Sequence, residues 1–299
     1  MSLTRRSALK RMVSVGAAAA ATAMPGPAEG STPRTAPADA VGMLYDTTLC
    51  IGCKACVVAC NAANGLTPDP GGSDGRYQAP LALNARTKNI IKRVEDGAGP
   101  ASFVKVQCMH CIDPACANAC MLGALKKREF GIVSYDVSLC VGCRYCQMAC
   151  PFNVPAFEWQ NAFTPKIVKC ELCRHRLAEG REPACTEVCP RKAVIFGRRT
   201  DLLAEAHRRL AASPGLYVPH VYGETEAGGT QVLYLSHVPF ERIGLPAYGP
   251  TAVPEPQRSL QHRLYQGFAA PVVLYGVLAA VTLRNRHTID APASSEEQP

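Results

Sequence analysis

Apolar residues along this chain gather in short runs punctuated by glycine and proline, with few long amphipathic stretches. Such runs predict four short strands, at residues 103–106, 131–135, 194–196 and 231–235. A helical spacing of apolar positions is clear only at residues 202–210. Residues 30–40 and 67–80 are rich in proline and small residues, and they predict a flexible linker and a surface loop. The pattern predicts an α+β fold with little regular structure.

One apolar segment near the C-terminus is longer. Residues 264–283 carry no charged side chain, and a helix of that length would extend about 30 Å, enough to cross the hydrocarbon core of a membrane. Arg284 and Arg286 follow at once and favour a cytoplasmic tail at 284–299. The alternative is a buried core helix, because the length is marginal for a transmembrane helix. A proline-rich connector at 241–263 favours the membrane anchor.

The N-terminus combines a basic segment with a short apolar one. Arg5 and Arg6 precede an alanine-rich stretch at residues 12–24, an arrangement typical of an export signal. We therefore expect a signal peptide at residues 1–28 and a linker at 29–42. The paired arginines favour the twin-arginine (Tat) route, which would deliver an already folded protein to the periplasm. A disordered basic tail is the alternative.

The cysteines change this picture, because all 16 fall into four quartets. The quartets are Cys50, Cys53, Cys56 and Cys60; Cys108, Cys111, Cys116 and Cys120; Cys140, Cys143, Cys146 and Cys150; and Cys170, Cys173, Cys185 and Cys189. The first and third are spaced C-x2-C-x2-C-x3-C, and the other two are the same run with a longer middle gap. In bacterial ferredoxins this run supplies three ligands to one [4Fe–4S] cube and the fourth to another cube. Four quartets predict four [4Fe–4S] clusters.

Two other uses of cysteine are alternatives to clusters. Exported proteins are often rich in disulfides, but disulfides do not require four compact groups that each end in C-x3-C. Zinc sites use C-x2-C pairs, but they usually combine two separated pairs, whereas the first and third quartets are continuous. The spacing favours iron–sulfur clusters, whose bulk in the interior would also explain the weak apolar periodicity.

An internal repeat gives the quartets an order. Residues 45–53 recur ninety positions later as residues 135–143, from Tyr-Asp through the first two cysteines. The second and fourth quartets share Pro-Ala-Cys-x3-Cys, at residues 114–120 and 183–189. This order predicts two nested ferredoxin-like units, each with two clusters. The outer unit would comprise residues 43–100 and 160–240, and the inner unit residues 101–159.

The ferredoxin rule then predicts which cysteines share a cluster, since three come from one quartet and one from its partner. The predicted sets are site 1 (Cys50, Cys53, Cys56 and Cys189), site 2 (Cys170, Cys173, Cys185 and Cys60), site 3 (Cys108, Cys111, Cys116 and Cys150) and site 4 (Cys140, Cys143, Cys146 and Cys120). His110 and His175 lie beside ligands, and with four thiolates at every cluster we expect them outside the ligand set. Gly52 and Gly142 are expected to let the backbone approach the cluster, or to form an ordinary turn.

No catalytic constellation stands out in the sequence, such as a nucleophile elbow or a phosphate-binding loop. The formal net charge of +8 comes partly from the two chain ends, so it is poor support for nucleic-acid binding. We therefore expect a non-catalytic electron-transfer subunit that binds no nucleic acid. A self-contained reductase acting at a cluster with an open iron is the alternative from another class.

These motifs resemble the four-cluster iron–sulfur subunits of membrane-bound molybdopterin oxidoreductases and periplasmic hydrogenases. The resemblance covers residues 43–286, and the segment at 221–235 is most similar to the hydrogenase-2 type of subunit. It implies an electron relay for anaerobic respiration between catalytic hydrogenase subunits and an integral membrane subunit that reacts with quinone. Formate dehydrogenase β subunits share the architecture and imply a molybdopterin partner instead.

Overall fold

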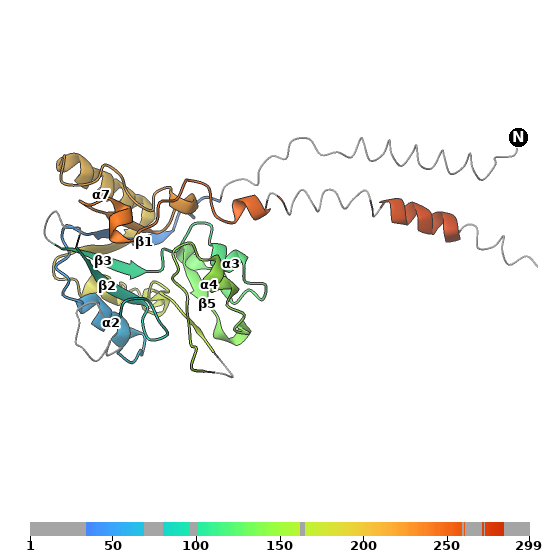
Figure 1. Ribbon diagram of the computed structural model, residues 1–299, viewed down its shortest axis with the longest axis horizontal. Helices are drawn as coiled ribbons and strands as arrows, with labels where there is room; N and C mark the ends of the chain where they lie inside the picture. Colours follow the sequence, from blue (N-terminus) through green and yellow to red (C-terminus); the bar gives the residue numbers. More distant parts are fainter. Residues whose placement is uncertain are drawn as a thin grey trace, which may run out of the picture. The chain divides into compact units, whose positions relative to one another are not determined.

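The computed structural model describes the middle of the chain with several gaps. The described residues are 34–68, 80–95, 101–161, 165–258, 260, 271 and 273–283. The chain divides into two compact units, Pro33–Pro254 and the two ends Met1–Thr32 with Glu255–Pro299. Every cysteine lies in the first of these units, whose elements are labelled in Figure 1.

The predicted signal peptide, the linker up to residue 33 and the tail at 284–299 lie outside the described residues. Residue 271 and residues 273–283 of the predicted membrane segment are described, and they are helical with exposed side chains. In the described part of the chain, no helix combines the length and the apolar character needed to cross a membrane. The export signal and the membrane anchor stay predictions.

A three-stranded sheet centred on β1 organises the larger unit. β1, Val41–Asp46, runs antiparallel to β8, Val194–Arg198, and parallel to β9, Val232–Leu235. Residues 42–46 are all buried, because both faces of the sheet are covered. The sheet therefore joins the beginning of the unit to segments that follow the last quartet.

Alternate residues of this sheet pack into two different cores. Leu44 and Leu233 pack against α7, Arg199–Ala212, whose apolar side faces the sheet. Tyr45 and Tyr234 point to the opposite face and pack among the cysteine-bearing segments. Figure 1 shows α7 on one side of β1, with β2, β3 and α2 on the other. One face of the sheet thus packs against cysteines of the first and fourth quartets.

Short antiparallel hairpins complete the β structure. They are β2 with β3 (Asn89–Val94 and Ser102–Gln107), β4 with β5 (Leu125–Lys127 and Val133–Tyr135), and β6 with β7 (Ala156–Phe157 and Ile167–Val168). The first hairpin spans the predicted boundary between residues 100 and 101, and the third spans the boundary between 159 and 160. Two of the three hairpins therefore cross the boundaries predicted between the outer and the inner unit.

A short helix carries the third cysteine of each quartet. These helices are α2, Ala55–Ala63; α3, Ala115–Asn118; α4, Tyr145–Ala149; and α6, Ala184–Glu187. The other helical segments are α5, Arg174–Ala178, and the 3-10 turns η1, Glu129–Gly131, η2, Val137–Leu139, η3, Glu226–Gly228, and η4, Phe240–Ile243. α2 packs against α6, and α3 packs against α4. The first quartet therefore neighbours the fourth, and the second neighbours the third.

Most of the elements expected from sequence are present. β3, β8, β9 and α7 each overlap the range predicted for them. The strand expected at 131–135 begins only at Val133, because the preceding residues form the turn η1 with Phe130 in the left-handed region (φ 56). β1 and β2 were not predicted. β1 is apolar on both faces and so lacks the alternation that marks a strand.

The boundaries expected at both ends of the unit differ from the structure. β1 starts at Val41, inside the predicted linker at 29–42. Ile243 and Leu245 are buried in the main core, although the connector was predicted to begin at residue 241. Proline and small residues in these segments concealed their packing role, because composition alone does not report tertiary burial.

The close approach at Gly42 predicts a site where stability depends on the missing side chain. A Cβ at this position would lie 1.8 Å from the carbonyl oxygen of Gln231, so Gly42→Ala should lower the free energy of unfolding by roughly 1–3 kcal/mol. Gly197, its register partner on β8, is the control, since the nearest atom to a Cβ there lies at 3.6 Å. Gly197→Ala should change stability by less than about 0.5 kcal/mol. Chemical denaturation followed by circular dichroism measures both, and equal effects would contradict the prediction.

Candidate iron–sulfur centres

All four quartets use the same local turn to bring their first two cysteines together. The residue just before the second cysteine is in the left-handed region in each, with φ of 72 at Gly52, 49 at His110, 71 at Gly142 and 50 at Leu172. The turn lets backbone N–H groups point at sulfur, since Gly52 N and Leu172 N each donate to the first cysteine's Sγ at 3.4 Å. Hydrogen bonds of this kind tune clusters. Glycine marked the turn in only two quartets, so sequence gave no indication of it in the others.

The internal repeat has a structural reason in the residues that precede quartets one and three. Asp46 accepts hydrogen bonds from Thr48 N at 3.0 Å and Thr48 Oγ1 at 2.6 Å. Asp136 accepts the equivalent bonds from Ser138 N at 3.0 Å and Ser138 Oγ at 2.6 Å. Each carboxylate thus closes a turn that directs the chain from a strand into the cysteine loop. The repeat encodes a way of entering the site, in addition to the ligands.

The structure brings the cysteines together in groups drawn from distant parts of the chain. In each group, neighbouring thiols raise the pKa of one cysteine through their charge. They are Cys189 and Cys53 for Cys50, and Cys185 and Cys173 for Cys60. They are Cys108, Cys116 and Cys150 for Cys111, and Cys120, Cys140 and Cys143 for Cys146. Each of these cysteines thus has neighbours from its own predicted site, and some neighbours come from another site, since Cys185 acts on Cys56 and Cys108 acts on Cys170. Cys56 has Cys50 and Cys189 as neighbours, and Cys170 has Cys60 and Cys185.

The protonation chemistry of these thiols fits a cationic cluster. All 16 are free of disulfides. Burial raises the pKa of Cys56 and of Cys116 to about 12, and that of Cys60 and of Cys146 to about 11, and neighbouring thiols add to each shift. Four thiolates in one buried place repel one another unless a metal centre binds them. The donor sets therefore suit iron–sulfur clusters, whose ligands are thiolates.

Among the described residues, no three potential ligands converge on a point that could hold a single metal ion. A tetrahedral zinc site would bring sulfur atoms to about 2.3 Å from one ion. In a cube, each of the four irons takes one cysteine instead. The assignment of individual cysteines to clusters stays a prediction.

The four sites follow one another through the unit. In three cases a thiol raises the pKa of a cysteine in the neighbouring site through its charge. Cys185 of site 2 acts on Cys56 of site 1, Cys108 of site 3 acts on Cys170 of site 2, and Cys146 of site 4 acts on Cys116 of site 3. Only Cys53 and Cys143 are exposed among the cysteines. With the predicted assignment of cysteines, sites 1 and 4 form the two ends of the series, and sites 2 and 3 lie inside.

Surface hollows open at both ends of this series. One is lined by Cys50, Cys53, Cys56 and Cys189 of site 1 together with Tyr45 and Lys54. The other is lined by all four cysteines of site 4 together with Met121 and Val141. Sites 1 and 4 thus each border a surface hollow, and each has one exposed cysteine, Cys53 or Cys143.

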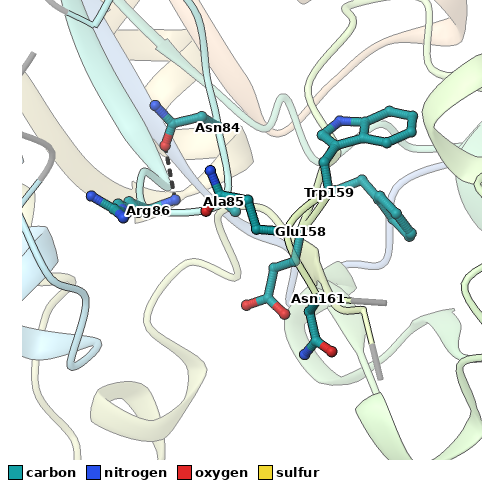
Figure 2. A pocket seen from close by; sticks show the side chains of 8 residues that line it. Asn84, Ala85, Arg86, Glu158, Trp159 and Asn161 are labelled. Carbon is teal, nitrogen blue, oxygen red and sulfur yellow. Dashed lines mark hydrogen bonds between the residues drawn. The ribbon is translucent and has the colours of Figure 1, made fainter. Parts of the chain in front are cut away.

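A third hollow contains no cysteine and lies between two loops, at residues 84–86 and 157–161. Figure 2 shows Glu158 and Asn161 pointing away from the Trp159 ring, and Asn84 Oδ1 accepting a hydrogen bond from Arg86 N at 2.8 Å. Trp159 is 65% exposed, and the Arg144 guanidinium lies 4.8 Å from its ring centre. This hollow has a polar and exposed rim, and it carries no reactive group.

Three lysines lie among the sites, and sequence reasoning missed two of them, Lys105 and Lys127. Lys105 and Lys169 are buried, and the latter donates to Cys170 O at 3.0 Å. Lys127 donates to Cys111 O at 3.0 Å and to Ile112 O at 2.7 Å, and burial lowers its pKa to about 8. Lys169 is marked in the sequence by its place next to Cys170. Lysines are ordinarily surface residues, so nothing in the sequence distinguished Lys105 and Lys127 from the others.

The two histidines beside ligands have different surroundings. His110 is fully buried, and its Nδ1 accepts a hydrogen bond from Val133 N at 3.2 Å. Burial, and then the positive charges of Lys169 and Lys127, hold the pKa of His110 well below its usual value. His110 is therefore a neutral structural residue with its Nε2 carrying the proton. His175 is exposed on α5.

The cross-quartet grouping predicts that two cysteines only four residues apart serve different clusters. Cys189→Ser should alter the same electron paramagnetic resonance (EPR) signal of the reduced protein as Cys53→Ser, because both belong to site 1. Cys185→Ser should alter a second signal, shared with Cys60→Ser. EPR spectra and iron content of the four variants test this. A common signal for Cys189→Ser and Cys185→Ser would contradict the grouping.

Comparison with known proteins gives the same chemistry. Residues 100–199 match the family described as a 4Fe-4S dicluster domain. The hydrogenase-2 operon protein HybA of Escherichia coli O157:H7 is 41% identical over 279 residues, which cover 82% of this chain and 84% of that protein. The iron–sulfur subunit of the nitrate-inducible formate dehydrogenase of Escherichia coli (strain K12) is 35% identical over 248 residues, covering 80% of this chain and 81% of that subunit. A protein of Nitratidesulfovibrio vulgaris, whose name states no function, is 46% identical over 248 residues, or 81% of this chain and 67% of its own length. This chain therefore belongs to the family of multi-cluster [4Fe–4S] electron-transfer subunits that includes HybA and the iron–sulfur subunits of formate dehydrogenases.

Proposed function

We propose that this chain carries electrons through [4Fe–4S] clusters at sites 1, 2, 3 and 4 in that order. The observation that carries the proposal is the succession of thiol groups, which interact across each neighbouring pair of sites. Exposed cysteines occur only at the two end sites. A series that is open at its ends and closed in its middle suits a relay between two partners.

The chain's own residues would hold the clusters and control their surroundings. The cysteine thiolates of the four sites bind iron, and the clusters supply one-electron redox chemistry. Backbone N–H groups donated to Cys50 and Cys170 stabilise the negative charge on sulfur. At sites 2 and 3 six of the eight cysteines are buried and none is exposed, so the fold shields these sites from water. No substrate-binding residue is part of this role, so catalysis belongs to a partner subunit.

Exposed apolar side chains at both ends support docking of other subunits. Met121, Val141 and Met148 around site 4 are 81%, 71% and 85% exposed. Ile51 and Val58 near site 1 are 56% and 68% exposed. Large apolar side chains gathered on a surface favour a protein or membrane interaction. One end would face the catalytic subunit, and the other a membrane subunit that reacts with quinone.

The hydrogenase partner is favoured over formate dehydrogenase by similarity. The identity to HybA is 41%, against 35% to the nitrate-inducible formate dehydrogenase subunit. We therefore propose a periplasmic hydrogenase as the source of electrons. A molybdopterin subunit of a formate dehydrogenase is the second candidate, because those subunits also match over most of the chain.

Purification of the complex from solubilised membranes tests the relay. The chain should co-purify with a catalytic subunit, contain iron for four clusters, and couple hydrogen oxidation to reduction of a quinone analogue. Val141→Asp together with Met148→Asp should reduce that coupling at least tenfold without loss of iron, because charge at the docking surface opposes association. Val253→Asp, at an exposed apolar position outside the cysteine segments, is the control. Coupling to formate instead of hydrogen would replace the partner, and a protein without iron would end the proposal.

The periplasmic location and the C-terminal anchor form a separate part of the proposal. They are supported by the arginine pair at the N-terminus and by the apolar segment at 264–283. Arg5→Lys with Arg6→Lys should leave the protein in the cytoplasm, with its clusters assembled. Truncation after residue 263 should release an exported protein from the membrane fraction. Cell fractionation measures both, and export of the double variant at the normal rate would contradict the Tat route.

A further inference from the structure

Lys105 is a charged side chain in the middle of the outer cysteine groups. It lies on β3 opposite Ile91 of β2 and is only 1% exposed. Its ammonium donates a hydrogen bond to the side-chain oxygen of Gln107. Burial of an unpaired ammonium costs several kcal/mol, so an opposing negative charge must stabilise it.

The groups that interact with Lys105 most strongly are cysteines of two different sites. Cys56 belongs to site 1, whereas Cys60, Cys170 and Cys185 belong to site 2. Ile91, the register partner of Lys105, lines the hollow of site 1, and Met43, which contacts the Gln107 amide, has its sulfur 4.0 Å from Cys185 Sγ of site 2. Among the described residues, no carboxylate forms an ion pair with it. Its positive charge is therefore shared by the two outer sites.

The position of Lys105 is fixed by buried contacts from the central sheet. Tyr234 OH donates to Lys105 O at 2.6 Å, and Tyr45 OH donates to Phe103 O at 2.9 Å. The Gln107 amide that accepts from the lysine lies against Met43, with its Nε2 at 3.3 Å from the Met43 sulfur. A backbone held at two points and a side chain held at its end leave the ammonium little freedom to move away.

We propose that Lys105 is a positioning residue that raises the reduction potentials of the clusters at sites 1 and 2 together. The inference rests on the proposed electron relay. Each cluster gains one negative charge when it accepts an electron, and a fixed neighbouring cation stabilises that reduced state. Because the same ammonium acts on both sites, its charge raises both potentials, and its removal should lower both.

Sites 3 and 4 do not share Lys105: site 3 has other lysines as neighbours, and site 4 has no cationic neighbour of comparable burial among the described residues. Lys169 and Lys127 act on Cys116 and Cys111 of site 3. At site 4 the groups that act on Cys146 are other cysteines and a backbone N–H. Removal of the Lys105 charge should therefore change the reduction potentials of the clusters at sites 1 and 2 and leave those at sites 3 and 4 unchanged.

The experiment compares Lys105→Met, Lys105→Gln and Lys105→Arg in the full-length protein purified with its clusters. Lys92→Met is the matched control, since Lys92 lies on the adjacent strand, pairs with Val104 and points to the opposite face of the hairpin. Iron content is measured first, and EPR-monitored redox titration then gives the midpoint potential of each cluster. The Cys53→Ser and Cys60→Ser variants assign the signals of sites 1 and 2.

Lys105→Met should lower the midpoint potentials of sites 1 and 2 by at least 59 mV, which corresponds to a tenfold loss in the equilibrium constant for one-electron reduction. Lys105→Arg should keep them near wild type, because the charge is retained, and Lys92→Met should change none. Lys105→Met and Lys105→Gln could instead lose the clusters of sites 1 and 2 while Lys105→Arg keeps all four. That result would support the requirement for a positive charge at residue 105 beside these two clusters.

Three results would overturn the inference. They are unchanged potentials in a fully loaded Lys105→Met protein, an equal shift at all four clusters, and a loss of clusters in Lys105→Arg that matches the loss in Lys105→Met. A wild-type protein without four clusters would refute the electron relay itself. The iron measurement therefore distinguishes a failure of the proposed function from a failure of the role of Lys105.

Discussion

The cost of placing several thiolates in one buried volume is the constraint on which the rest of the structure depends. Thiolates repel one another, and an apolar interior disfavours their charge. Iron ligation removes both costs, so the fold has to bring four sulfurs to each cluster from two distant segments. The packing of α2 on α6 and of α3 on α4 meets this requirement. The central sheet holds the outer segments in register from one side.

The interior that results is unusual in its charges. Two of its buried cations, Lys105 and Lys169, lie near sulfur and backbone oxygen, whereas the buried Arg176 pairs with the carboxylate of Glu187. Buried lysines ordinarily lose their proton, but here the thiol groups oppose that tendency at Lys105. Electrostatics and ligation are thus coupled. The negative charge of the cluster thiolates stabilises the buried lysines, and the lysines place positive charge beside the clusters. An electron relay needs such adjustment, because its clusters are chemically alike.

Sequence reasoning was most successful where the information is local. The cysteine spacing of the quartets and the helical pattern of α7 depend on residues a few positions apart. The Asp-x-Ser/Thr turns before Cys50 and Cys140 are equally local, but only the repeat that contains them was noticed in the sequence. It was less successful at β1, which is apolar on both faces, and at the domain boundaries, which two hairpins cross. It did not anticipate the left-handed turns at His110 and Leu172, because no glycine marks them.

By itself, the sequence determined the chemistry: sixteen thiols in a ferredoxin spacing admit few uses, and the repeat indicates how the quartets are ordered. Only the tertiary structure decided which sites are open, which thiols interact across sites, and that Lys105 lies between two of them. The physical reason is one of range. Ligand spacing is fixed by bond geometry within a loop, whereas burial and electrostatic neighbours depend on chain segments that meet only after folding.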